Sequence, residues 1–258
     1  IFEDRTVFLV KSSVVALESF IKKCSLIAEI RIAKKLHQSI IGYDIEDQER
    51  LATEIQEKIQ DCTADNNTRV VVLDGNIIKR HPLITSFIVR NQQALTSFSL
   101  ENNQEHATEM ASLTLLGDIR KTIEKDNIFI HHTVEGVQIY DSMNNDKDLY
   151  GKITEEAVQK TQDNVHSAYI MPVTEEYSEY YHGKPSSWSA SVDKIIFQNK
   201  KLFSISVGNI SNICSENDYD ELQRTSCIES PAQSWNALSI GSYTDYCNSD
   251  LCRYEGAV

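Results

Sequence analysis

The feature that most constrains the fold is an apolar run, Val70 to Leu73, that ends abruptly in Asp74, Gly75 and Asn76. A continuous run of aliphatic, mostly β-branched residues is typical of a parallel strand buried on both faces. Open α/β sheets carry their chemistry at the carboxyl ends of such strands, where Asp74 lies. Gly75 and Asn76 readily adopt positive φ, so we expect a sharp turn that holds the carboxylate in a crevice. An ordinary strand and turn would show the same pattern, so a functional interpretation requires partners elsewhere in the chain.

From Arg69 onward, strand patterns alternate with helical ones, as in a parallel sheet covered by helices. The further strands expected are residues 129–140, 169–173, 202–207 and 237–243, and the helices are residues 106–116, 154–164 and 189–200. Residues 85–104 show no regular pattern. We therefore predict an α/β fold, a parallel sheet with helices on both faces, for a domain spanning residues 67–258.

Residues 1–66 differ from the rest and are predicted to form a small helical or α+β domain. A strand is expected at Thr6 to Val10, a helix at Val14 to Lys23, and an amphipathic helix at Tyr43 to Cys62. This region either docks a partner or acts as an inhibitor like a prodomain, and the sequence does not choose between them. Because the chain begins at Ile1 rather than Met, we expect it to be a piece of a longer protein.

The formal net charge of −13 argues against a nucleic-acid partner, which would need a basic face. No apolar run is long enough to span a bilayer and no signal peptide is recognisable, so we expect a cytoplasmic protein without membrane contact. The six cysteines show neither Cys-x-x-Cys nor zinc-ligand spacing, so no metal or cofactor is predicted. We expect reduced thiols, with Cys247 and Cys252 as the pair best placed to form a disulfide.

Three polar residues lie where a strand ends or a helix begins. Asp74 closes the apolar strand, His106 opens the predicted helix at 106–116, and Asn209 follows the strand at 202–207. A carboxylate that orients a histidine, a histidine that acts as base, and an amide that binds a developing oxyanion are three of the four parts of a serine acyl-transfer site. We therefore expect the Asp74 carboxylate to lie about 2.6 to 3.2 Å from an imidazole nitrogen of His106.

The order and the sequences of these segments resemble those of the subtilisin-like serine proteases, or subtilases (peptidase family S8). The similar motifs, in chain order, are Val72 to Asn76 with His81-Pro82, His106-Ala107-Thr108 with Met110-Ala111, Leu202 to Asn209, and Asn236 to Thr244. The resemblance implies a subtilisin-like three-layer fold and a serine endopeptidase that cleaves peptide or protein substrates. It also implies that Pro172, Val173 and Thr174 pair with the substrate by β-augmentation, although Pro172 lacks one ladder donor.

Two further segments, Gly183 to Ala190 and Pro231 to Leu238, resemble the intracellular bacterial subtilases that are paired with an AAA ATPase. That resemblance implies an AAA ATPase partner for this chain and agrees with a cytoplasmic location.

The sequence departs from the family pattern in three ways. Where the family has Thr or Ser and then Gly after the aspartate, this chain has Gly75 and Asn76, which loses a hydroxyl. Ala107 replaces the glycine of the histidine motif, and no Gly-Thr-Ser-x-Ala/Ser nucleophile motif occurs within the 258 residues. Two interpretations follow: the chain is a fragment whose parent supplies the serine, or it is an inactive homologue that binds peptides or a partner protein. Retention of Asp74, His106 and Asn209 together favours the fragment.

Overall fold

The computed structural model describes residues 12–27, 44–65, 67–142, 149–161, 166–175, 184–209 and 226–242. The chain divides into two compact units, Ile1–Arg50 and Leu51–Val258. In the first unit, helix α1 (Val14–Lys23) has the predicted bounds, and the hydroxyl of Ser13 caps it by accepting from the backbone N–H of Ala16. This helix buries no side chain. The strand expected at residues 6–10 lies outside the described residues, and the domain boundary near residue 66 stays a prediction.

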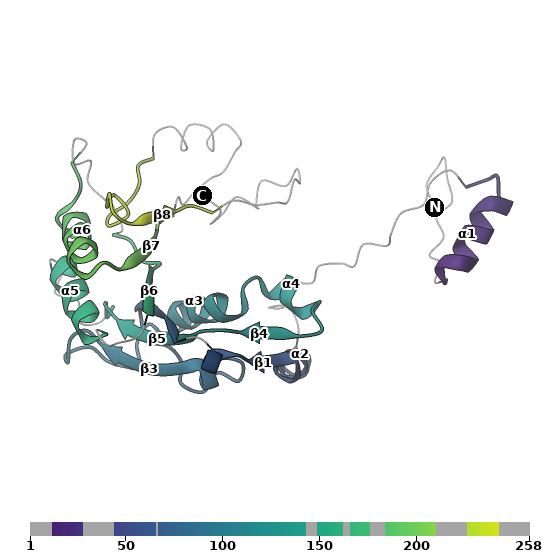
Figure 1. Cartoon of the computed structure of the whole chain (residues 1–258), viewed down its shortest axis with the longest axis horizontal. Coiled ribbons are helices and arrows are strands. Elements are labelled where there is room, and N and C mark those ends of the chain that lie inside the picture. The colour runs from purple at the N-terminus through teal and green to yellow at the C-terminus, as the bar shows by residue number, and fades with distance from the viewer. Residues whose placement is uncertain are drawn as a thin grey trace. The chain divides into compact units, whose positions relative to one another are not determined.

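The main sheet of the second unit has six strands in the order β3-β5-β2-β6-β7-β8, and all five neighbouring pairs are parallel (Figure 1). The strands are β2 (Thr68–Asp74), β3 (Ile88–Gln93), β5 (Thr133–Gln138), β6 (His166–Met171), β7 (Leu202–Ser206) and β8 (Leu238–Ile240). The apolar strand β2 is central, with Asp74 opposite Gln138 of β5 and Val72 opposite Ile170 of β6. The predicted α/β class with a parallel sheet is confirmed.

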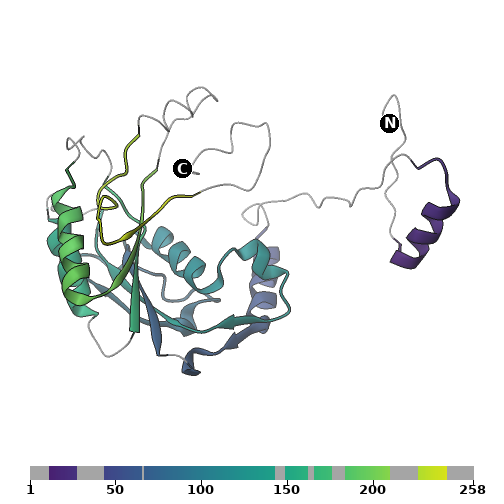
Figure 2. The same cartoon turned by 45° about the horizontal axis from the view of Figure 1, so that its top comes forward.

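Helices cover both faces of this sheet, and the side chains of β2 alternate between them. Val71 and Leu73 belong to the core formed with α5 (Tyr150–Lys160) and α6 (Ser187–Asn199). Val72 belongs to the opposite core, which contains residues of α2 (Ile45–Lys58) and α3 (Gln104–Leu116). Figure 2 shows the strands passing between α3 and the α5–α6 pair. The three-layer arrangement was predicted and is confirmed.

The structure differs from the predicted strands at two places. Residues 129–140 form two strands rather than one, because β4 (Ile128–Ile130) leaves the main sheet and pairs in parallel with β1 (Ile59–Asp61). Strand β3 occupies a stretch that was predicted to be irregular. It lies at the edge of the sheet, where a strand does not need alternating apolar side chains, so its polar residues gave no strand pattern. The remaining helices are α4 (Ile119–Ile123) and the 3₁₀ turns η2 (Thr63–Asp65) and η3 (Thr85–Phe87).

The sheet also contains a buried charge that the sequence patterns do not reveal. Glu135 on β5 is fully buried and accepts hydrogen bonds from Arg69 Nη1 at 2.8 Å and Gln92 Nε2 at 2.9 Å. A second guanidinium, that of Arg90, lies 3.6 Å from the other carboxylate oxygen. Because a buried carboxylate is costly unless it is paired and hydrogen-bonded, these groups form one structural network across β2, β5 and β3.

Candidate active site

Asp74 is the last residue of β2, and its pairing with Gln138 of β5 fixes its position. Its backbone carbonyl accepts the N–H of Ile139 at 2.8 Å, and its side chain is fully buried. One carboxylate oxygen, Oδ1, accepts the backbone N–H of Gly75 at 2.7 Å. The central strand therefore presents a rigidly held carboxylate at the carboxyl edge of the sheet, which is where chemistry in parallel sheets is concentrated.

Gly75 is required for close packing and not for the left-handed backbone that the sequence suggested. Positive φ occurs at Asn103, Lys200, Gly117 and Gly208 and not at Gly75 or Asn76, so the chain after Asp74 does not use the positive φ that these residue types allow. A Cβ at Gly75 would lie only 1.9 Å from the backbone oxygen of Asn103. The absent side chain therefore lets the segment that leads into α3 lie directly against the end of β2. The Asn76 side-chain amide donates a hydrogen bond to the carbonyl of Leu100 in the same segment.

His106 lies in the first turn of α3, and its Nδ1 is 2.7 Å from Asp74 Oδ2. This distance lies within the range expected from the sequence. Because an ionised carboxylate can only accept, Nδ1 is the protonated nitrogen of the neutral ring, and the lone pair is on Nε2. The Asn103 side chain, at the start of the helix, accepts the N–H of Ser142 at 3.0 Å and helps to fix the helix entry.

The surroundings of His106 favour its charged form. The hydrogen bond to Asp74 raises the pKa of His106 above its ordinary value of 6.5, and the negative charges of Asp74 and Glu109 add to this effect against the opposing effect of burial. The imidazole is 45% exposed, whereas the Asp74 side chain is 0% exposed. The pair thus combines a buried, fixed carboxylate with a ring that reaches solvent.

Tyr140 is a member of this site that sequence reasoning missed. Burial raises the pKa of Tyr140 to about 12, and the charge of Asp74 and a hydrogen bond to it contribute further. The phenol therefore stays protonated near neutral pH and is a donor to the carboxylate. A signal was present in the sequence, since Tyr140 is the last residue of the strand predicted at residues 129–140, and chemistry in parallel sheets is concentrated at the carboxyl ends of strands.

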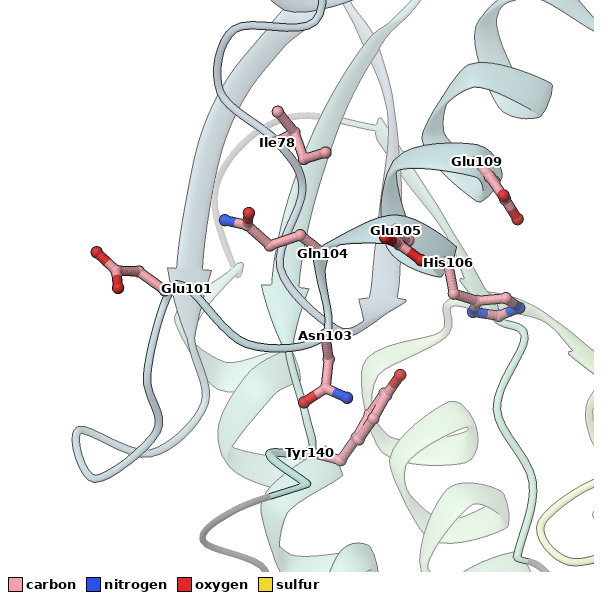
Figure 3. Close-up of a pocket in the computed structure, with 8 residues that line it drawn as sticks. All are labelled: Ile78, Glu101, Asn103, Gln104, Glu105, His106, Glu109 and Tyr140. Carbon is pink, nitrogen blue, oxygen red and sulfur yellow. The ribbon is translucent and has the colours of Figure 1, made fainter. Parts of the chain in front are cut away.

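A cavity of about 570 Å³ opens beside the imidazole (Figure 3). Figure 3 shows the hydroxyl of Tyr140, which follows β5, directed toward the side of the cavity where His106 extends from the first turn of α3. The other lining residues come mainly from α3 and the segment before it: Ile78, Glu101, Asn103, Gln104, Glu105 and Glu109. The cavity gives a substrate access to the exposed side of His106, and its three glutamates make that approach acidic.

The other predicted site residues lie at the same edge of the sheet. Asn209 is exposed and follows β7, and the stretch 172–174 is partly buried and follows β6. Strand β6 pairs with both β2 and β7, so the stretch 172–174 follows the strand next to β2, and Asn209 follows the strand one further along the sheet. The structure thus brings Asp74 and His106 into direct contact and places the other four residues, Asn209 and Pro172 to Thr174, at the carboxyl ends of neighbouring strands.

Several other properties concern only the described part of the chain. There, no group of three or more His, Cys, Asp or Glu side chains is arranged to hold a metal ion. None of the helices described is both long and apolar enough to cross a bilayer. Cys24, Cys62 and Cys227 carry free thiols, whereas Cys214, Cys247 and Cys252 lie outside the described ranges.

Comparison with known proteins gives one family. Residues 65–256 match the subtilase family (peptidase S8). Similar solved structures include the prenylagaramide maturation protease PagA, with 16% identity over 76% of this chain and 59% of that one and a TM-score of 0.45. A cold adapted subtilisin-like serine proteinase has 14% identity over 74% and 64%, with a TM-score of 0.45. MycP1 from Mycobacterium smegmatis has 13% identity over 82% and 60%, with a TM-score of 0.44.

This chain therefore spans less than two thirds of the length of each of these three structures. None of the curated proteins matches the chain at a significant level.

Proposed function

The chain belongs to the subtilase family of serine proteases, and from this premise we propose that it is an endopeptidase with His106 as general base and Asp74 as the residue that orients it. The observation that carries the proposal is the 2.7 Å contact between His106 Nδ1 and Asp74 Oδ2. A carboxylate at this nitrogen selects the tautomer whose Nε2 can accept a proton, and it stabilises the imidazolium that forms. The half-exposed ring beside an open cavity supports this role.

The proposed reaction is acyl transfer through a serine supplied by residues outside these 258. His106 Nε2 takes the hydroxyl proton as the serine oxygen attacks the peptide carbonyl, and then gives that proton to the leaving amine. Water hydrolyses the resulting acyl-enzyme by the same route. The Asn209 amide is proposed to donate to the oxyanion that develops on the carbonyl oxygen, a role supported by its exposure at the end of β7.

We propose that the substrate lies along the stretch 172–174. This stretch follows β6 at the same sheet edge as Asp74, and an extended peptide can add to such a stretch through backbone hydrogen bonds. Pro172 provides no N–H, and the N–H of Glu175 is already donated to the Ser230 carbonyl at 2.8 Å. Pairing with a substrate would therefore rely on Val173 and Thr174 and on carbonyl acceptors.

A second candidate is a catalytically inactive subtilase-like module that binds peptides or a partner protein. It is favoured by one observation, the absence of a Gly-Thr-Ser-x-Ala/Ser motif from these residues. An AAA ATPase partner stays a prediction from the sequence resemblance. A cytoplasmic location is likewise proposed, and the free thiols of Cys24, Cys62 and Cys227 are in keeping with it.

A covalent serine-hydrolase probe applied to the full-length protein separates the two candidates. We expect the wild-type protein to be labelled and His106→Ala to lose labelling by roughly 10³-fold or more, because the serine would lack its base. The matched control is His131→Ala, which removes an exposed imidazole on a different part of the domain and should leave labelling unchanged. Absence of labelling in the wild type, or equal labelling of His106→Ala, would favour the binding module.

A further inference from the structure

The buried carboxylate of Asp74 has more acceptor capacity than its contacts with Gly75 and His106 use. Oδ1 accepts the N–H of Gly75 at 2.7 Å, and Oδ2 lies 2.7 Å from Nδ1 of His106. A carboxylate can accept about four hydrogen bonds, and this side chain is 0% exposed, so bulk solvent does not reach it. Because a buried charge is costly unless it is hydrogen-bonded, a further donor from the protein would stabilise it.

Position 75 cannot supply that donor as a side-chain hydroxyl. Subtilases usually have Thr or Ser directly after the aspartate, whereas this chain has Gly75. A Cβ there would lie 1.9 Å from the backbone oxygen of Asn103 and 2.9 Å from its Cβ. The segment that leads into α3 therefore occupies the space that a hydroxyl-bearing side chain would need. A hydroxyl that donates to Asp74 has to come from another element.

Tyr140 brings a hydroxyl to this carboxylate from the neighbouring strand. It follows β5, and the N–H of the preceding residue, Ile139, is donated to the Asp74 carbonyl at 2.8 Å, so strand pairing holds Tyr140 next to Asp74. A hydrogen bond joins the phenol to the Asp74 side chain, and the ring is partly buried. In Figure 3 the Tyr140 hydroxyl is directed toward the side of the cavity where His106 extends.

We propose that Tyr140 is a positioning residue that replaces the hydroxyl excluded from position 75 and acts on His106 through Asp74. This inference rests on the proposed function, in which His106 is the base. A phenol that donates to the carboxylate restricts its rotation and draws negative charge away from it. The attraction of Asp74 for the Nδ1 proton is thereby moderated. Tyr140 thus sets how strongly His106 holds a proton, while Asp74 sets where that proton lies.

The described charged and titratable groups around His106 come from β2, from the end of β5, and from α3 with the segment before it. They are Asp74, Tyr140, Glu101, Glu105 and Glu109. Four of these are carboxylates, and removal of a negative charge near His106 can only lower its pKa or leave it unchanged. Tyr140 is neutral, and without its hydroxyl the Asp74 carboxylate stabilises the imidazolium more strongly. Loss of this hydroxyl should therefore raise the pKa of His106, which is the opposite sign.

A packing role for Tyr140 makes a different prediction. The ring also lines the cavity, and phenylalanine would fill the same space. If Tyr140 only packs there, Tyr140→Phe leaves the pKa of His106 unchanged. A second variant carries 3-fluorotyrosine at position 140, which keeps the ring and the hydroxyl and makes the phenol a stronger donor. The proposed role requires this variant to lower the pKa of His106, and a packing role does not.

The test is an NMR titration of the His106 imidazole in the full-length protein. We expect the pKa of His106 to rise in Tyr140→Phe and to fall with 3-fluorotyrosine at position 140. In an Asp74→Asn background, Tyr140→Phe should cause no shift, because the carboxylate through which the phenol acts is absent. The matched control is Tyr169→Phe on β6, which removes a buried phenol that contacts the Thr161 hydroxyl at 2.8 Å and should leave the pKa of His106 unchanged.

Peptide hydrolysis by the same variants is measured in parallel. Tyr140→Phe should lower kcat roughly tenfold with little change in KM, because the lost hydrogen bond orients the base and does not hold the substrate. An unchanged pKa of His106 in Tyr140→Phe, shifts of the same sign in the two Tyr140 variants, or a shift that persists in the Asp74→Asn background would overturn the inference. The expected shifts without any hydrolysis would refute the proposed activity and leave Tyr140 coupled to the Asp74–His106 pair. Hydrolysis without either shift would do the reverse.

Discussion

Two buried carboxylates lie on neighbouring strands of the same sheet, and their surroundings differ. Glu135 on β5 and Asp74 on β2 are both 0% exposed. The main partner of Glu135 is the guanidinium of Arg69, which is itself only 9% exposed. The partner of Asp74 is the imidazole of His106, which is 45% exposed and lines a cavity.

Burial alone therefore does not distinguish a structural carboxylate from a functional one in this molecule. Arginine stays protonated at any accessible pH, so the Arg69–Glu135 pair can hold strands together but cannot exchange a proton. Histidine titrates near neutral pH, so the Asp74–His106 pair can. The exposure and the proton affinity of the partner, not the depth of the carboxylate, mark the site proposed for catalysis.

The largest expected effect comes from Asp74→Asn. The asparagine amide can donate to Nδ1, which would place the proton of the neutral imidazole on Nε2 and remove the base. We expect kcat/KM for peptide hydrolysis by the full-length protein to fall roughly 10⁴-fold. Thermal unfolding should change little, because the amide retains the shape of the carboxylate. A loss of less than about tenfold would show that Asp74 does not orient the base.

For the other carboxylate, Glu135, the corresponding change removes its partner. Arg69→Met should lower the stability of the fold. Removal of the guanidinium leaves the Glu135 charge buried with a weaker set of partners, and breaking such a pair costs about 3 kcal/mol in the free energy of unfolding. Urea denaturation measures this loss. The control is Arg90→Met, expected to cost below about 1 kcal/mol, because that side chain is 45% exposed and lies 3.6 Å from Glu135. Equal costs for the two variants would contradict the proposed structural role of Arg69.

Gly75→Ala tests the packing that brings His106 to Asp74. The added methyl would stand 1.9 Å from the Asn103 backbone oxygen, so the segment leading into α3 must shift. We expect about 1 to 3 kcal/mol of destabilisation by urea unfolding, together with reduced probe labelling. Gly241→Ala is the control, since its methyl would meet only Val207 Cγ2 at an ordinary 3.6 Å. An unchanged stability and labelling of Gly75→Ala would show that the close approach is not required.

The smallest expected effect is a change of pH dependence in Glu109→Gln. The negative charge of Glu109 contributes to the raised pKa of His106, so its removal should lower that pKa. Neutral His106 is the active base, and hydrolysis rises as pH increases through its pKa. The acid limb of kcat/KM should therefore move to lower pH. Glu105→Gln, which also removes a cavity glutamate but one that does not contribute to the raised pKa, should leave the limb in place.

The sequence predicted the elements whose pattern reflects burial on both faces. Val70 to Leu73 formed the central strand, and the residue types at Asp74 and His106 identified the contact that the structure contains. It did not predict β3, because an edge strand needs no apolar alternation. Glu135 was also missed, since a glutamate in a strand pattern does not indicate whether a distant arginine will neutralise it.

Close approaches between distant segments were equally hidden from the sequence. The role of Gly75 depends on the Asn103 carbonyl, and that of Gly208 depends on Glu229. In each case the glycine leaves room for another part of the chain, and Gly208 in addition adopts a positive φ of 109°. Only the three-dimensional structure identifies which part that is.

The central claim is that Asp74 holds His106 as a base of raised proton affinity, and an NMR titration of the His106 imidazole tests it most directly. The pKa of His106 in the wild type should lie above its ordinary value of 6.5, because the charge and hydrogen bond of Asp74 stabilise the imidazolium. In Asp74→Asn that pKa should fall, since burial is then opposed mainly by the weaker effect of Glu109. A pKa of His106 that is the same in both proteins would contradict the account.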